Sequence, residues 1–223
     1  MSAPELPLSW GVDRDTLEEA LDWARERAVL LALFAMVLVF GCHAWTRRAI
    51  THGPGILAPD EPVQQPLQPQ PRWQAYGHTF TGLAAFEVRA RVLSTERYRF
   101  DPPAKLAPVD FALGWGPMSD SRVLDRLTIV QDNRWFHWAA RELPIPEATI
   151  ISHAANMHMI PGDAAVRSRL LDVKEGQVVR IRGFLVKAES AEGFGWVSSL
   201  SRTDTGNGAC EVVWVESVQT ADR

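Results

Sequence analysis

The segment "SHAANMHMIP", residues 152–161, contains the residue types best suited to bind a metal ion or haem. His153, Met157, His158 and Met159 lie within seven residues. Imidazole and thioether groups together suit a soft ion such as Cu(I), and imidazole also ligates haem iron. A metal- or haem-handling protein would therefore use His153, Met157 and His158.

The spacing of these residues allows a second interpretation. In a strand, His153, Met157 and Met159 face one way and His158 faces the other, and in a helix the two histidines are about 140° apart. A shared site therefore needs a loop. Otherwise the methionines are core residues and each histidine is a hydrogen-bonded polar group. We expect this second arrangement and no cofactor, with copper or haem as the alternative.

Aromatic residues supply a second set of candidates. Trp115 lies between two glycines, and the run "NRWFHW" places Trp135 and His137 on one face of a strand, with Phe136 and Trp138 on the other. Outward-facing aromatic residues on small β domains bind partners or ligands. Trp115, Trp135 and His137 are thus candidate partner-binding residues, and the alternative is that they pack in the core.

Local signatures of catalysis are missing from the sequence. There is no nucleophile elbow, glycine-rich phosphate loop, HExxH helix or CxxC pair. The serines Ser198, Ser199 and Ser201 offer hydroxyls, and a triad assembled in space leaves no local signature. Cys42 and Cys210 do not form a disulfide framework. We expect a protein that is not an enzyme, and an envelope hydrolase is the third hypothesis for function.

The apolar run "AVLLALFAMVLVFGCHAW", residues 28–45, indicates the location of the protein. Its eighteen residues carry no charge and lie between pairs of arginines. This length is sufficient to cross a hydrocarbon core of about 30 Å. We predict a single transmembrane helix, and a buried core helix or a cleaved signal peptide is the alternative.

Residues 1–27 form a short acidic tail that leads into this helix. The sequence Asp15-Thr16-Leu17-Glu18 has the pattern of a capping box, which predicts an amphipathic helix start. Arginine counts on the two sides are nearly equal, so the short tail decides the orientation. We expect the N-terminus inside, and the C-terminal domain in the periplasm or outside, of a bacterial inner membrane.

Residues 46–73 are rich in proline and glutamine. The part from Gly53 to Trp73 has six prolines and four glutamines in 21 residues. Proline lacks a backbone donor and fixes φ, and glutamine adds no apolar surface, which is typical of an extended linker. We predict a spacer that holds the following domain away from the bilayer.

Residues 74–223 have the pattern of a β-rich soluble domain. Alternating or apolar runs predict strands at 86–93, 179–186, 196–201 and 209–218, and stripes of apolar residues predict short helices at 121–127 and 163–171. Gly183 inside a strand indicates a sharp bend, as in small closed sheets. We predict a mainly antiparallel β domain with a few short helices, an OB-like or SH3-like small barrel.

Charge excludes one large class of partner. Residues 74–223 carry 17 basic and 18 acidic side chains, with no basic block. Nucleic acid binding needs clustered lysine and arginine, so no nucleic acid partner is expected. A membrane anchor, a spacer and a domain without catalytic motifs favour a binding or assembly module with a protein partner in a membrane or cell-envelope complex.

Overall fold

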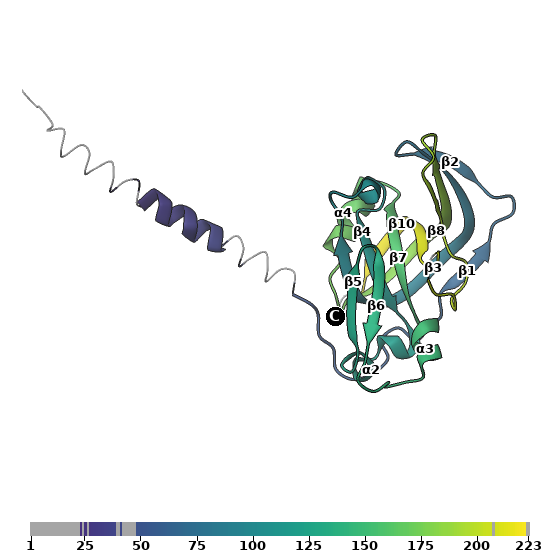
Figure 1. Cartoon of the computed structure of the whole chain (residues 1–223), viewed down its shortest axis with the longest axis horizontal. Helices are drawn as coiled ribbons and strands as arrows, with labels where there is room; N and C mark the ends of the chain where they lie inside the picture. Colours follow the sequence, from purple (N-terminus) through teal and green to yellow (C-terminus); the bar gives the residue numbers. More distant parts are fainter. Residues whose placement is uncertain are drawn as a thin grey trace, which may run out of the picture. The chain divides into compact units, whose positions relative to one another are not determined.

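The computed structural model describes residues 23, 25, 27–38, 41, 48–206 and 208–221. The chain divides into two compact units, Met1–Arg48 and Ala49–Arg223 (Figure 1). Each unit is described below by itself.

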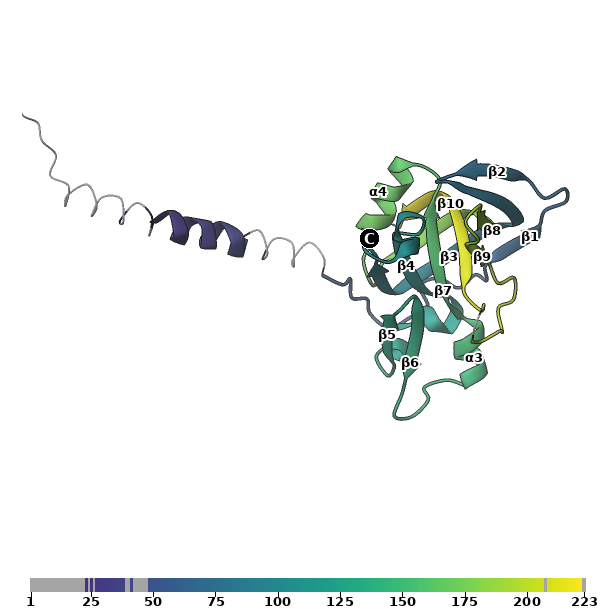
Figure 2. The same ribbon diagram turned by 45° about the horizontal axis from the view of Figure 1, so that its top comes forward.

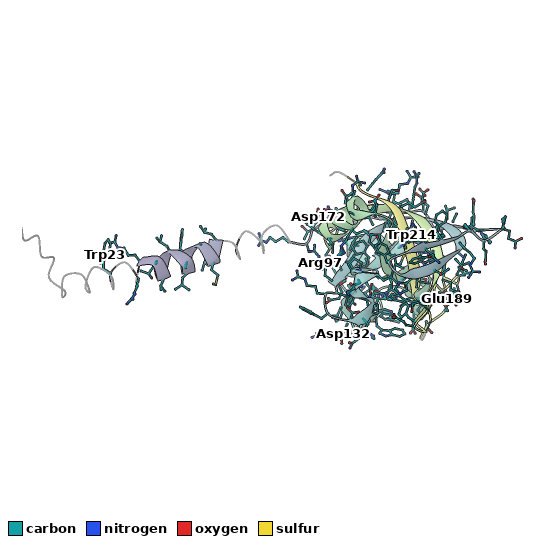
Figure 3. All side chains as sticks on the ribbon, turned by 90° about the horizontal axis from the view of Figure 1, so that it is seen from above. Trp23, Arg97, Asp132, Asp172, Glu189 and Trp214 are labelled. Carbon is teal, nitrogen blue, oxygen red and sulfur yellow. The ribbon has the colours of Figure 1, made fainter. Side chains whose placement is uncertain are left out.

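Within the first unit, residues 27–38 and 41 are helical. Side chains project from all sides of this helix (Figure 3). Its large apolar side chains are 52% to 68% exposed, among them Leu31, Phe34 and Val37. The helix therefore has exposed apolar residues around its whole circumference within the part that the structure describes.

Only part of the predicted transmembrane segment can be compared with the structure. Residues 39, 40 and 42–45 of the segment 28–45 lie outside the described residues, as does most of the predicted tail at 1–27. Among the residues that are described, none belongs to a helix both long enough and apolar enough to cross a membrane. The spanning helix remains a prediction.

The second unit is a mainly antiparallel β domain with a few short helices, as predicted. Its described strands are β1 (Val63–Pro66), β2 (Arg72–Ala75), β3 (His78–Arg97), β4 (Val109–Gly114), β5 (Thr128–Asp132), β6 (Trp135–Ala139), β7 (Ala154–Pro161), β8 (Val178–Ser190), β9 (Gly195–Val197) and β10 (Glu211–Thr220). Its helices are α2 (Ser121–Leu124), α3 (Glu147–Ser152) and α4 (Ala164–Asp172), with 3-10 turns η1 (Pro102–Lys105) and η2 (Gly116–Ser119).

Five of these strands form a closed sheet in the order β3, β4, β7, β10 and β8, and β8 pairs back with β3. The pair β7–β10 is parallel and the other four pairs are antiparallel. Closure depends on the length of β3, which has 20 residues and register shifts at Gly82/Ala84 and Val92/Ser94. These bulges bend β3, so that this one strand pairs with β4 on one side and with β8 on the other and closes the sheet.

Gly183 allows the closest approach in this sheet. It pairs with Val215 of β10, and a Cβ atom at this position would collide with the carbonyl oxygen of Trp214. The register of β10 shifts between Val215 and Ser217. The bend expected from Gly183 is therefore present, and it exists because only glycine permits this contact.

The core inside the closed sheet comes from the alternate residues that face inward. Its largest side chains include Phe111, Leu113, Trp115, Met157, Met159, Ile181 and Leu185. Helix α4 packs Val166 and Leu170 onto this core. Asp163 caps α4 by accepting a hydrogen bond from the Val166 amide at 2.7 Å.

The folded unit begins at Ala49 and includes most of the segment predicted as a spacer. Strands β1 and β2 both pair with β3, and Ala58 is fully buried. The amide of Ile50 donates to the carbonyl of Glu175 at 2.8 Å. Prolines are compatible with this arrangement because β1 is an edge strand with Pro66 at its end. Composition alone therefore placed the start of the domain too late, at Gln74.

Trypsin should distinguish the two domain boundaries. Arg48 precedes the folded unit, whereas Arg72 belongs to β2, whose backbone is paired with β3. We expect the protected fragment of the purified chain to start at Ala49, because cleavage needs a locally unpaired backbone. N-terminal sequencing of the fragment tests this, and a fragment that starts at Trp73 would show that β1 and β2 are not part of the stable domain.

The other sequence predictions agree in part. The strands expected at 86–93, 179–186 and 209–218 lie in β3, β8 and β10, and β9 pairs antiparallel with β8 as expected but is shorter. The helix expected at 121–127 is the short α2. Helix α3 was missed, because its six residues show no clear apolar period.

Candidate functional site

The segment that opened the sequence analysis forms strand β7 and the residues just before it. Met157 and Met159 are fully buried inside the closed sheet. Asn156 and His158 alternate with them and face the other side, where each is at most 5% exposed. The methionines are core residues, and the outer face of β7 carries the polar groups.

The two histidines have separate environments. His153 caps the end of α3, and its ring lies 3.1 Å from Glu61. His158 lies 2.8 Å from Asp110 and its ring packs 4.3 Å from that of Trp196. The strand rise places Ala154 and His158 roughly 13 Å apart. Among the described residues, no group of three or more His, Cys, Asp or Glu side chains could hold a metal ion.

Glu61 connects His153 with the candidate Trp115. One carboxylate oxygen of Glu61 accepts the indole N–H of Trp115 at 2.7 Å, and the other lies 3.1 Å from His153. Trp115 is fully buried and belongs to the core of the closed sheet. Its surroundings agree with the packing alternative, and its partner Glu61 comes from the segment that was expected to be a free spacer.

The hairpin β5–β6 lies outside the closed sheet against β4 and β7 (Figure 2). Its two turn residues, Asn133 and Arg134, have positive φ of 50° and 66°, as in a type I′ turn. Asparagine favours this conformation, but arginine does not. The turn holds Arg134 in place for its side-chain contacts.

Arg134 anchors the hairpin to the sheet. Its guanidinium lies 2.6 Å from the Asp101 carboxylate and 3.2 Å from Asp110, and it also donates to the Ala107 carbonyl at 3.1 Å. The same group stacks 3.9 Å from the centre of the Tyr98 ring. Asp110 is fully buried, and the guanidinium of Arg134 and the ring of His158 both lie within ion-pair distance of its carboxylate.

A pocket of about 160 Å³ lies where β6, α3, β7 and the connection between β9 and β10 meet. Its lining residues are Trp115, Trp135, Phe136, Trp138, Ile151, Ala154, Ala155, Asn156, Ser201, Arg202, Asp204, Thr205, Gly206, Ala209, Cys210 and Glu211. The rim residues Ser201, Asp204 and Thr205 are exposed. The pocket therefore opens to solvent on the side of the 201–206 loop.

The four aromatic residues of this pocket have no ring partners. Among the described residues, none of their rings stacks on another ring or lies under a cation. By contrast, Trp73, Phe80 and Trp214, which cover another face of the sheet, contact one another at 4.9 to 5.6 Å (Figure 3 labels Trp214). Trp115 belongs to the core of the closed sheet, and Phe136 and Trp138 pack against the buried cluster that includes Leu93 and Ile150, so these rings are both pocket walls and core contacts.

Polar side chains form the floor of the pocket. Glu211 is 1% exposed and one of its oxygens lies 2.6 Å from Arg202, while the other has no hydrogen-bond partner within the described chain. Asn156 donates to the Arg134 carbonyl at 3.0 Å and accepts from Gln131 at 2.7 Å. Burial raises the pKa of Glu211 to about 8, and the nearby Arg202 opposes this rise.

The stability of the domain should depend on the protonation of Glu211. The folded state keeps a proton that an unfolded glutamate releases near pH 4.5, so the stability from Glu211 is lost as the pH rises toward 8. We expect the free energy of unfolding to fall by on the order of 3 to 4 kcal/mol between pH 5 and 8. Denaturant unfolding of Glu211→Gln should show a smaller fall, and an equal fall would assign the effect to other groups.

The thiol and hydroxyl groups near the pocket have no histidine partner among its lining residues. Burial raises the pKa of Cys210 to about 11, so its thiol is protonated at neutral pH and is a poor nucleophile. Neither His153 nor His158 lines the pocket, so Ser201 and Cys210 have no histidine base there. Ser199 does not line it either, and donates to Asp204 at 2.6 Å.

The structure brings together some of the residues singled out from the sequence. Trp115 and Trp135 both line the pocket, whereas His137 is exposed and lies outside it. Sequence reasoning missed Arg202 and Glu211. One signal was available, because Glu211 interrupts the apolar strand "ACEVVWV", and a buried charge needs a partner.

Comparisons with protein-family models, curated proteins and solved structures found no match for this chain.

Proposed function

We propose that this chain is a single-pass, membrane-anchored binding or assembly module that contacts a component of the bacterial cell envelope through the pocket at β6, β7 and the 201–211 segment. The pocket is the observation that carries this proposal. It combines four aromatic walls without ring partners, a buried floor of polar groups and an open rim. This combination is typical of ligand sites.

The OB-like alternative for the domain fits the strand order best. Counted along the chain, the five strands of the ring are β3, β4, β7, β8 and β10; the third and fifth, β7 and β10, form the parallel pair, and helix α4 lies between the third and fourth, β7 and β8. Five-stranded Greek-key barrels of this type bind ligands on the second and third strands and the adjoining loops. The pocket lies at this position, next to β7 and the β9–β10 connection, although fold analogy alone does not define a ligand.

Support for the membrane anchor comes from the first unit. An apolar helix that is exposed around its whole circumference is unstable in water and fits a lipid environment. The charge-free run continues through residue 45, only four positions before the folded unit begins at Ala49. The domain would then work close to the bilayer.

Photo-cross-linking of the full chain in its native membrane tests this proposal. A photoreactive residue at Thr205, on the pocket rim, should give a covalent adduct with the bound component. The matched control is Thr203, which is exposed on the same loop but does not line the pocket. We expect an adduct from position 205 and at most a weak one from position 203.

Two results would contradict the proposal. Equal labelling at 203 and 205, or none at either position, would mean that the pocket is not the binding site. If alkaline carbonate extracts the full chain from membranes, the chain is not anchored by a membrane-spanning helix. A variant lacking residues 28–45 is the control, because it shows how a chain without this segment behaves in the same extraction.

A further inference from the structure

The size of the pocket limits what can occupy it. Sites for whole drug-sized ligands enclose about 300 to 1,000 Å³. The pocket here encloses about 160 Å³. It therefore accepts one small unit, such as a single side chain or a single six-membered ring, while the rest of a longer ligand stays outside the rim.

The walls and the floor place different demands on this unit. Trp135, Phe136 and Trp138, which are partly exposed, offer apolar ring faces. Asn156, Arg202, Asp204 and Glu211 offer amide, guanidinium and carboxyl groups, which donate and accept hydrogen bonds in planar geometries. The occupant needs an apolar face together with an edge of groups that both donate and accept.

Charge separates the remaining candidates. Arg202 lies 2.6 Å from Glu211, so an incoming cation would meet a positive charge that is already paired with the acid on the floor. An incoming anion would meet Asp204 at the rim. Arg202 and Asp204 thus offer opposite charges at the same pocket. A neutral occupant fits best.

We propose that the pocket binds one pyranose unit of a glycan. A pyranose ring has apolar C–H faces that stack on aromatic rings and a circumference of neutral hydroxyl groups that donate and accept hydrogen bonds. This inference rests on the proposed function, because it takes the pocket as the binding site of the chain. It adds the chemical class of the ligand.

Calorimetric titration of the full chain, in a detergent without a sugar headgroup, tests the ligand class. The probes are a tetramer of N-acetylglucosamine, a tetramer of α-1,4-linked glucose and an arginine-containing tetrapeptide. We expect one of the two glycans to bind at millimolar or lower concentration and the peptide not to bind. The two glycans distinguish an amino-sugar polymer from a neutral glucan.

Variants test whether the binding uses the pocket. Trp135→Ala should weaken glycan binding at least about tenfold, as expected for the loss of a stacking face. Thr205→Trp, which fills the rim from an exposed position, should also weaken it. Phe100→Ala is the control, because Phe100 is 98% exposed and does not line the pocket.

Three results would overturn the glycan assignment. These are failure of both glycans to bind at millimolar concentration, glycan binding that Trp135→Ala and Thr205→Trp leave unchanged, and binding of the arginine peptide that Glu211→Gln abolishes. If the cross-link at position 205 persists while both glycans fail, the ligand class is wrong and the binding site stands. If both experiments fail, the proposed function falls as well.

Discussion

Arg134→Ala should lower the free energy of unfolding of the β domain by about 3 to 5 kcal/mol, because it removes the guanidinium beside the buried Asp110 carboxylate, which then faces only the ring of His158. Asp110 is fully buried and lies 3.2 Å from the guanidinium. The substitution also removes the 3.1 Å hydrogen bond to the Ala107 carbonyl and the stacking on Tyr98. Urea unfolding of the wild type and the variant measures the difference.

Arg126→Ala is the matched control for this prediction. Arg126 pairs with Glu142 at 3.5 Å, but the two side chains are 53% and 86% exposed. Loss of an exposed pair costs about 0 to 1 kcal/mol. Adding Asp110→Asn to Arg134→Ala should restore part of the lost stability, since the buried charge is then gone. A loss for Arg134→Ala as small as that for Arg126→Ala would show that the hairpin is not anchored in this way.

Met157→Ala should destabilise the domain by about 2 to 5 kcal/mol, because it leaves a cavity inside the closed sheet. Met157 is fully buried in this core, whose other members include Phe111 on the paired strand β4. Thermal unfolding followed by circular dichroism gives the change in stability.

Two further measurements accompany the Met157→Ala experiment: the stability of Met157→Leu and the metal content of the wild-type chain. Met157→Leu keeps the volume and should cost less than about 1.5 kcal/mol. Purified wild-type chain should contain no stoichiometric copper or iron, since His153, Met157 and His158 do not converge on one point. If Met157→Ala leaves the stability unchanged but removes a bound metal, the core assignment of the methionine is wrong and the metal hypothesis is favoured.

The strands that the sequence predicted best are those with a regular pattern. In β3, buried and partly exposed residues alternate from Phe80 to Ala90, and this period of two is readable without a structure. The capping aspartate and apolar stripe of α4 are equally local. Local signals of this kind predicted the β-rich class and the approximate limits of β8 and β10.

The N-terminal boundary of the β domain could not be predicted from a local side-chain pattern. Gln64, Gln65 and Pro66 of β1 have little apolar character, and they join the sheet through backbone pairing with β3. Backbone hydrogen bonds do not depend on side-chain hydropathy, so a proline- and glutamine-rich segment can form an edge strand. Only long-range contacts such as Glu61 with Trp115 reveal the role of this segment.

The candidate site was even less predictable. Trp135, Asn156, Arg202 and Glu211 come from segments that are far apart in the chain, and the pocket exists only after β6 and the 201–206 loop meet β7. The sequence singled out Trp115 and Trp135, which both line this pocket. It could not pair Arg202 with Glu211, because this ion pair depends on the path of the β9–β10 connection.

Hydroxyl-radical footprinting tests most directly whether this pocket is occupied where the protein works. The oxidation of individual aromatic side chains is compared between the full chain in intact membranes and the purified chain in detergent. We expect Trp135 and Trp138, which line the pocket, to be protected in membranes, while the fully exposed Phe100 reacts equally in both samples. Equal oxidation of Trp135 and Trp138 in the two samples would contradict the account, because it would mean that the pocket is empty in the membrane.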